Sequence, residues 1–365
     1  MKCTIGTSEN TDVSAAVREA VSEMKDPILL IFITDYTTLK ETSKELHELF
    51  PKAECIGTSG TTYVKGQVMV DKLVVVGFLD GIEAQCGVIK NLSKCPVMDI
   101  KIVEDQIKNI DPGPEDTVCI EFCTNSEEQL VTTLGAAFYD RPIGLMGGTV
   151  CRYPKNITPQ VCYNGELYED ACAYAFVKNL SGKVKVYKEN IYGLDEKRKY
   201  AHLATKVDIT QKELTELDHR PAAEVYCEET GITRKNIVDN VFYNPLGRIV
   251  GDDVFIFCMS EVKSNGAIVN HKRIYKNDTI YILKPLDYKK IIQETGQQIQ
   301  NEFKQISLLF CVNCSNRDYF FQKEDYLDSY VSYMSSLGPY MCMVAGGEQF
   351  NNQHVNESMI CVVFE

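Results

Sequence analysis

The chain alternates short apolar runs with longer amphipathic stretches, and the order of these segments repeats. Residues 28–33 (ILLIFI) form an apolar run that is followed by a helical stretch, a glycine-containing segment and a second apolar run at 73–79 (LVVVGFL). Continuous apolar runs of this length, flanked by helices, are typical of strands that are buried on both faces. The pattern therefore predicts one unit made of a strand, a helix and further strands.

The same order recurs twice along the chain. A second copy has apolar runs at 118–123 and 171–177, and a third copy has them at 308–312 and 359–364. The spacing from Phe32 to Gly57 is 25 residues, and so is the spacing from Phe122 to Gly147. We therefore predict an internal repeat in which 28–33, 118–123 and 308–312 are equivalent central strands.

The helical stretches begin at recognisable positions. Thr38 with Glu41, and Ser126 with Gln129, have the spacing of capping boxes, in which each side chain satisfies a free amide of the first turn. The apolar residues that follow return at helical intervals. Strand, helix and strand thus alternate in each copy.

Between the second and third copies the pattern changes. Residues 181–222 are charged and polar, and Pro221 predicts a helix over 222–230. Three strand-like runs follow at 253–261, 267–274 and 279–284, with Asn265-Gly266 as a hairpin signal, and 288–303 carries a helical apolar stripe. We expect an α/β (mixed α+β) protein with helix-covered sheets and two closely packed domains, residues 1–182 and 183–365.

Composition excludes several classes of protein. The 365 residues carry 38 Lys+Arg and 51 Asp+Glu, a formal net charge of −13, and the longest basic cluster is residues 197–199. This charge argues against nucleic-acid binding. The longest unbroken apolar run, 171–177, has seven residues, against roughly 18 for a membrane span, and the first residues do not resemble an export signal. We expect a cytoplasmic protein without membrane insertion.

Candidate chemistry begins with the glycine segments that follow the apolar runs. They contain Thr58 and Ser59, Gly147 and Thr149, and Glu348. Backbone amides and hydroxyls at strand ends can hold an anionic group. None of these segments matches the phosphate loop or the dinucleotide motif, which disfavours nucleotides. A steric alternative is that glycine merely permits a tight turn beside a neighbouring strand.

The fifteen cysteines are an odd number in mostly apolar surroundings, so we expect them to be reduced. Cys311 and Cys314 form the only CxxC, which is compatible with a redox motif or a nucleophile. The alternative is a buried Cys311 on a strand. A structural zinc site needs a second pair, and the five histidines lack metal spacing, so we expect no metal and no cofactor.

Arg317 follows the third central strand, and Glu348 follows the glycines of the same copy. A guanidinium can hold a carboxylate with two parallel hydrogen bonds, and a glutamate can meet an amine. Together they suit an amino acid. The alternative for Arg317 is a salt bridge with Asp318 or Glu324.

The chain resembles the FIST family, with a FIST N-terminal and a FIST C-terminal domain. The first half matches through 4–8 (TIGTS), the alanines of 15–20 and 56–60 (IGTSG). The second half matches through 222–226 (AAEVY), 244–247 (NPLG), 309–311 (LFC) with Arg317, and 346–348 (GGE). The resemblance implies an intracellular sensory module of signal transduction that binds small ligands such as amino acids.

We therefore expect a sensory module, not an enzyme, that binds a small polar ligand and acts through a separate signalling output protein. The alternatives are a cysteine-dependent enzyme or redox protein that uses Cys311 or Cys314, and a scaffold without a ligand. The expected ligand-binding residues are Thr58, Ser59, Gly147, Thr149, Asn244, Cys311, Arg317 and Glu348.

Overall fold

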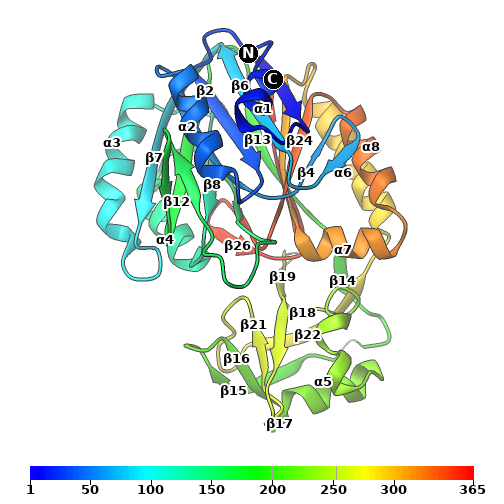
Figure 1. The fold of residues 1–365 in the computed structure, drawn as a ribbon. Helices are drawn as coiled ribbons and strands as arrows, with labels where there is room; N and C mark the ends of the chain where they lie inside the picture. Colours follow the sequence, from blue (N-terminus) through cyan, green and yellow to red (C-terminus); the bar gives the residue numbers. More distant parts are fainter. Residues whose placement is uncertain (199, 252) are drawn as a thin grey trace. The chain divides into compact units, whose positions relative to one another are not determined.

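The computed structural model describes residues 1–198, 200–251 and 253–365. The described residues form two compact units. Unit 1 comprises Met1–Lys188, Thr295–His354 and Met359–Glu365, and unit 2 comprises Glu189–Glu294 and Val355–Ser358. Helices and mixed sheets alternate, as expected for an α/β (mixed α+β) protein (Figure 1). No helix of the described residues has the length and apolar character needed to cross a membrane.

Three successive repeats of the chain build three six-stranded sheets. Repeat 1 contains β1 (Lys2–Ser8), α1 (Val13–Ala20), β2 (Leu29–Thr34), α2 (Leu39–Leu49), β3 (Glu54–Ser59), β4 (Thr62–Val64), β5 (Gln67–Met69) and β6 (Leu73–Asp80). Repeat 2 contains β7 (Ile82–Lys90), α3 (Ile100–Ile110), β8 (Thr117–Cys123), α4 (Glu127–Ala137), β9 (Gly144–Thr149), β10 (Val161–Tyr163), β11 (Glu166–Tyr168) and β12 (Ala171–Asn179). Repeat 3 contains β13 (Val184–Asn190), α6 (Tyr288–Glu302), β23 (Leu308–Cys314), α7 (Ser315–Lys323), α8 (Leu327–Ser336), β24 (Tyr340–Ala345), β25 (Glu348–Phe350), β26 (Gln353–Val355) and β27 (Ser358–Phe364).

Each repeat has the same strand pairing. The first apolar run (β2, β8 or β23) lies between a parallel neighbour (β3, β9 or β24) and an antiparallel one (β6, β12 or β27). The three runs therefore occupy equivalent central positions in their sheets.

The hairpin of each repeat leaves its own sheet. The β4–β5 hairpin pairs with β24 of repeat 3, β10–β11 pairs with β3 of repeat 1, and β25–β26 pairs with β9 of repeat 2. The exchange is cyclic, so every sheet is completed by another repeat. The backbone hydrogen bonds of these hairpins thus hold the three repeats together.

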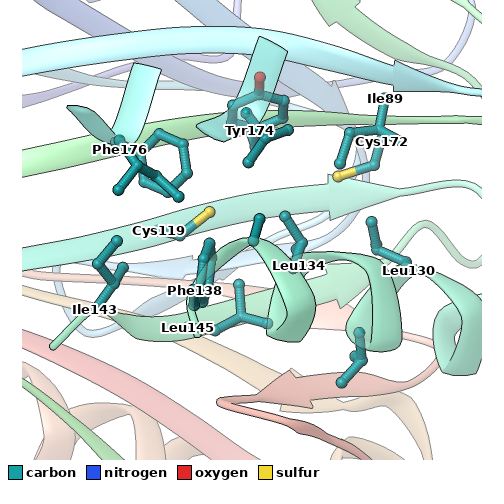
Figure 2. Packing of buried hydrophobic residues seen from close by; sticks show 14 of the residues in the cluster. Ile89, Cys119, Leu130, Leu134, Phe138, Ile143, Leu145, Cys172, Tyr174 and Phe176 are labelled. Carbon is teal, nitrogen blue, oxygen red and sulfur yellow. The ribbon is translucent and has the colours of Figure 1, made fainter. Parts of the chain in front are cut away.

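Helices cover the outer face of each sheet, and the inner faces pack on one another. In repeat 2, Leu130 and Leu134 of α4, and Phe138 directly after it, lie against the strands (Figure 2). On the inner faces, the Phe122 and Phe310 rings lie 6.5 Å apart between two sheets. Each buried side chain of this size contributes about 1.5–3 kcal/mol, so apolar burial on both faces stabilises the sheets.

The expected capping boxes are not formed. Thr38 and Ser126 do stand at the helix starts, but neither side chain makes a capping hydrogen bond. The Thr38 hydroxyl instead lies 3.2 Å from that of Thr34, and Ser126 has a left-handed φ of 56°. In both cases the preceding turn directs the side chain away from the amides of the first turn.

The equal 25-residue spacing conceals a shift in register. Phe32 pairs with Gly57, whereas Gly147 pairs with Glu121 and Phe122 pairs with Gly148. Because side chains alternate between the two faces of a strand, a one-residue shift exchanges the faces. The counterpart of Phe32 is therefore Glu121, although Phe32 and Phe122 have the same spacing to a glycine.

Unit 2 interrupts repeat 3 between β13 and α6. It contains β14 (Tyr192–Leu194), β15 (His202–Asp208), β16 (Glu213–Leu217), β17 (Arg220–Pro221), α5 (Ala222–Thr230), β18 (Leu246–Val250), β19 (Asp253–Phe257), β20 (Met259–Val262), β21 (Ile268–Asn270) and β22 (Thr279–Pro285), whose strands form a nine-stranded sheet. The helix over 222–230 is confirmed. The expected strand 253–261 is two strands separated at Cys258. The contiguous domain division at 182/183 stays a prediction.

Candidate functional site

The carboxyl ends of the parallel strands in unit 1, hereafter the C-terminal edge, are where the chain crosses between sheets. After β3, β9 and β24 it passes to the hairpin in the neighbouring sheet. At one crossing the Thr149 amide donates to the Gly347 carbonyl (2.9 Å), and the Gly346 amide donates to the Thr149 carbonyl (2.9 Å). The Thr149 and Gly346 amides therefore form hydrogen bonds within the crossing.

The glycines at this edge permit close approach. A Cβ atom on Gly147 would lie 1.7 Å from Oε1 of Glu121, and one on Gly57 would lie 2.3 Å from the ring of Phe32. A Cβ on Gly148 would lie 2.8 Å from Val312 in the neighbouring sheet. Side chains cannot fit at such distances, so packing alone accounts for these glycines.

Thr58 and Ser59 end β3, and both are buried. The Thr58 hydroxyl donates to the Gln160 carbonyl at 2.9 Å, across the junction between β3 and the exchanged hairpin. Its contact joins repeats 1 and 2.

A polar cluster surrounds Thr149 at the end of β9. Its hydroxyl donates to Glu127 Oε1 (3.0 Å) and accepts from Gln349 Nε2 (3.2 Å), and it lies 3.5 Å from Cys123 Sγ.

Next to this cluster, fully buried Glu121 accepts from Cys172 Sγ at 3.3 Å. Burial raises the pKa of Glu121 to about 8 against the weaker opposing effect of that hydrogen bond. The Glu121 carboxyl is therefore mostly protonated at neutral pH.

A second polar cluster is centred on Asp318 of α7, whose side chain is fully buried. Its carboxylate accepts hydrogen bonds from Tyr63 and Arg152, and from Gln322 Nε2 at 2.8 Å. Tyr63 belongs to repeat 1, Arg152 to repeat 2 and Asp318 to repeat 3. A single buried carboxylate thus joins all three repeats. The Arg152 side chain is 31% exposed, so the cluster reaches the surface there.

Arg317, Glu348 and Cys311 are buried completely. The Arg317 guanidinium lies over the rings of Phe321 (5.1 Å) and Tyr330 (5.6 Å). Cys311 stands in the middle of β23, in agreement with the alternative of a buried Cys311 on a strand. Glu348 begins β25 opposite Gly148. The structure brings Gly147, Thr149 and Glu348 together at one strand pair, β9–β25.

All fifteen cysteines are free, in agreement with the expected reduced state. Within the described ranges, no three His, Cys, Asp or Glu side chains gather closely enough to hold a metal ion.

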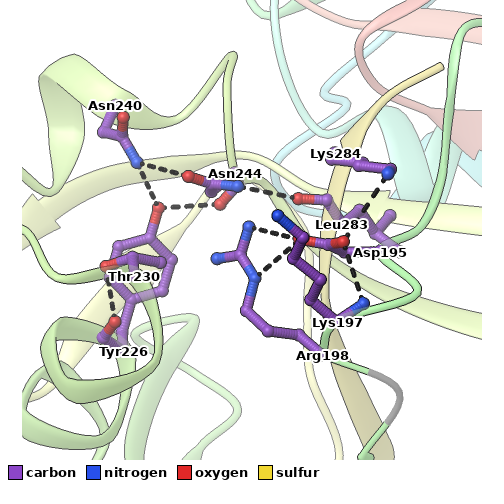
Figure 3. A network of polar contacts seen from close by, with 9 residues as sticks. All are labelled: Asp195, Lys197, Arg198, Tyr226, Thr230, Asn240, Asn244, Leu283 and Lys284. Atoms are coloured by element: carbon purple, nitrogen blue, oxygen red, sulfur yellow. Dashed lines mark hydrogen bonds and ion pairs between the residues drawn. The ribbon is translucent and has the colours of Figure 1, made fainter.

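Asn244 lies in unit 2, in the network of Figure 3. Its amide donates to the Leu283 carbonyl (3.2 Å) and its Oδ1 accepts from Asn240 (3.1 Å), while the Tyr226 hydroxyl donates to its carbonyl (2.7 Å). These contacts fix the loop before β18 against α5. Nearby, Asp195 accepts from the Arg198 Nε at 3.0 Å (Figure 3).

Sequence reasoning missed a pocket of about 260 Å³ at the C-terminal edge of repeat 1. It opens where β1 and β2 end and β6 begins. Its lining is largely polar and consists of Asn10, Thr11, Val13, Ala16, Thr34, Asp35, Thr37, Thr38, Thr42, Asp71, Lys72 and Leu73. Thr34 and Asp35 directly follow the apolar run 28–33, and this position was the available signal.

Two domain models of one known family match this chain. The FIST N domain model matches residues 28–220, and the FIST C domain model matches residues 222–351. The protein belongs to the FIST family, whose domains are sensory domains that bind small ligands.

No curated protein matches this chain. Among solved structures, a cyanuric acid hydrolase from A. caulinodans is similar over 49% of this chain and 71% of its own, at 10% identity and a TM-score of 0.29. A likeness of this size carries no functional argument.

Proposed function

We propose that this protein is a sensory module that binds a small polar ligand, an amino acid, at the C-terminal edge of unit 1. One observation carries the proposal: polar and charged side chains gather at this edge, where a polar pocket opens. Elsewhere the sheets of unit 1 are predominantly apolar. Ligands of α/β sheets bind outside the carboxyl ends of the strands, because the loops there converge.

The Asp318 cluster supplies a route by which binding can change the conformation. Tyr63, Arg152 and Asp318 come from three different repeats, so a shift of one repeat strains hydrogen bonds to the other two. Buried charge-assisted hydrogen bonds are costly to break, which makes such a junction respond as a unit. We propose that this junction transmits ligand binding to a separate output protein in the cytoplasm.

The alternative of a cysteine-dependent enzyme has less support. A nucleophilic or redox-active thiol must be reachable and must form a thiolate. Cys311 is completely buried, and Cys314 is only 3% exposed. Arg317 and Glu348 stay a prediction as direct ligand contacts, and a ligand would reach them only after local opening.

A thermal-shift screen tests the proposed function. The probes are the twenty standard amino acids, short organic acids and nucleotides, each tested singly. A ligand present at 100 times its dissociation constant adds about 2.7 kcal/mol to the free energy of unfolding, so a true ligand raises the Tm measurably. Calorimetric titration then confirms the stoichiometry. If no compound of any class raises the Tm, the proposed sensory function is rejected.

A further inference from the structure

The three repeats have an acidic residue at the same point after the hairpin. Asp71, Asp170 and Glu357 each stand two residues after the hairpin, and each has a left-handed φ, of 53°, 46° and 53°. The shared backbone conformation shows that the positions are equivalent. Their surroundings differ between repeats 1 and 2.

In repeat 2 the equivalent site is filled by the chain itself. Asp170 accepts from the Ser93 amide (2.9 Å) and from the Ser93 hydroxyl (2.8 Å), in the loop after β7. On the other side, the Ala171 amide donates to the Thr124 hydroxyl at 3.0 Å. These hydrogen bonds tie together the end of β7, the end of β8 and the start of β12. The Asp170 carboxylate accepts the N–H group of Ser93.

In repeat 1 the site is open. The side chains of Asp71 and Lys72 line the pocket, and neither forms a hydrogen bond or ion pair with another described residue. Lys72 stands where repeat 2 has Ala171, because Phe32 pairs with Val75 as its counterpart Glu121 pairs with Tyr174. An unpaired carboxylate and an unpaired ammonium therefore face the same small pocket.

The inner wall of the pocket offers hydroxyl groups. Thr42 is only 2% exposed, lines the pocket, and its hydroxyl forms no hydrogen bond with another described side chain or carbonyl. Thr38 begins α2, and its side chain does not cap the helix, so the first amides of α2 lack a side-chain partner. The Thr42 hydroxyl is therefore available to form a hydrogen bond with a polar molecule in the pocket.

We propose that the repeat 1 pocket is the ligand site, and that it binds a small zwitterion carrying one cationic amine and one anionic group. The amine is held by Asp71 and Asp35, in the place that the Ser93 amide takes in repeat 2. The anionic group contacts Lys72 and the Thr38 end of α2. This inference rests on the proposed function and adds the location and the charge pattern of the ligand. The volume, about 260 Å³, lies just below the roughly 300–1,000 Å³ that is typical of ligand pockets.

Titration calorimetry with the intact protein tests the inference. Each of the twenty standard L-amino acids is titrated into the wild type. The tightest binder is then compared with its amine and its acid, for example L-alanine with ethylamine and propionate. Loss of one charged contact should weaken binding by roughly 10- to 150-fold, so each half-molecule binds at least tenfold more weakly.

The variants Asp71→Asn and Lys72→Gln are then compared with Asp170→Asn, the matched change in repeat 2. Asp71 is exposed and Lys72 half-buried, so both variants should fold with an unchanged Tm. We expect each to weaken amino-acid binding at least tenfold, and Asp170→Asn to leave the dissociation constant unchanged.

Three outcomes separate this inference from the proposed function. Equal affinity of wild type, Asp71→Asn and Lys72→Gln rejects the pocket but leaves the sensory function intact. Binding of organic acids or nucleotides alone rejects the zwitterion and the amino acid as the ligand, but leaves the sensory binding of a small polar ligand intact. Absence of binding by every compound of the wider screen rejects both.

Discussion

Repeats 1 and 2 follow the same backbone course but place different chemistry at equivalent positions. Where repeat 1 packs Phe32 over Gly57, repeat 2 packs the Glu121 carboxyl over Gly147. Where repeat 2 closes the edge with Asp170 and Ser93, repeat 1 leaves a pocket. The comparison teaches that the fold requires neither the buried carboxyl nor the open pocket, so both are specific features of one repeat.

Phe32→Glu has the largest expected effect on stability, because it places in repeat 1 the glutamate that repeat 2 has at the equivalent position. The new carboxyl replaces a buried ring in a predominantly apolar cluster. We expect the free energy of unfolding to fall by about 4 kcal/mol or more. Urea denaturation measures it. A loss below about 1 kcal/mol would show that repeat 1 tolerates the carboxyl as well as repeat 2 does.

Stability should depend on pH through Glu121. Its pKa is raised to about 8 in the folded protein, and the ordinary value is 4.5. Between these values the unfolded chain releases the proton that the folded protein keeps, so stability falls by a few kcal/mol as pH rises from about 5 to 8. Glu121→Gln, which cannot titrate, should flatten this slope. Urea denaturation from pH 5 to 9 checks it, and parallel curves for the two proteins would contradict the prediction.

Two glycine-to-alanine variants of repeat 2 should change the free energy of unfolding in opposite directions. Gly147→Ala places a Cβ against the Glu121 carboxyl and should destabilise by about 1–3 kcal/mol through overpacking. Gly135→Ala in α4 meets no atom within 4 Å and should stabilise by about 1 kcal/mol through helix propensity. Thermal denaturation compares them. The steric account of the edge glycines fails if both variants are equally stable.

The smallest expected effect is the difference in stability between variants at the two acidic positions, Asp170 and Asp71. Asp170→Asn weakens the two hydrogen bonds to Ser93 and should cost about 1 kcal/mol. Asp71→Asn in the ligand-free protein removes no such bond and should change stability by less than about 0.5 kcal/mol. Urea denaturation of both variants measures the difference. A loss for Asp71→Asn as large as that for Asp170→Asn would mean that repeat 1 is closed like repeat 2.

The candidate site was only partly visible in the sequence. The edge was predictable, because Ser59, Thr149 and Glu348 follow apolar runs and strand ends meet at one edge. The pocket was not, because Thr34, Asp71 and Thr11 have no local pattern in common. Arg317 was predicted to hold a carboxylate, which stays a prediction, and its complete burial over Phe321 and Tyr330 depends on how α7 and α8 pack.

The sequence by itself determined the strands, the helices and the threefold order, because apolar periodicity reflects local geometry that every copy shares. Only the tertiary structure decided the exchange of hairpins, the one-residue register that sets Glu121 opposite Gly147, and the insertion of unit 2 between β13 and α6. These features follow from contacts between residues far apart in the chain, where packing across sheets selects one arrangement among several that the local pattern allows.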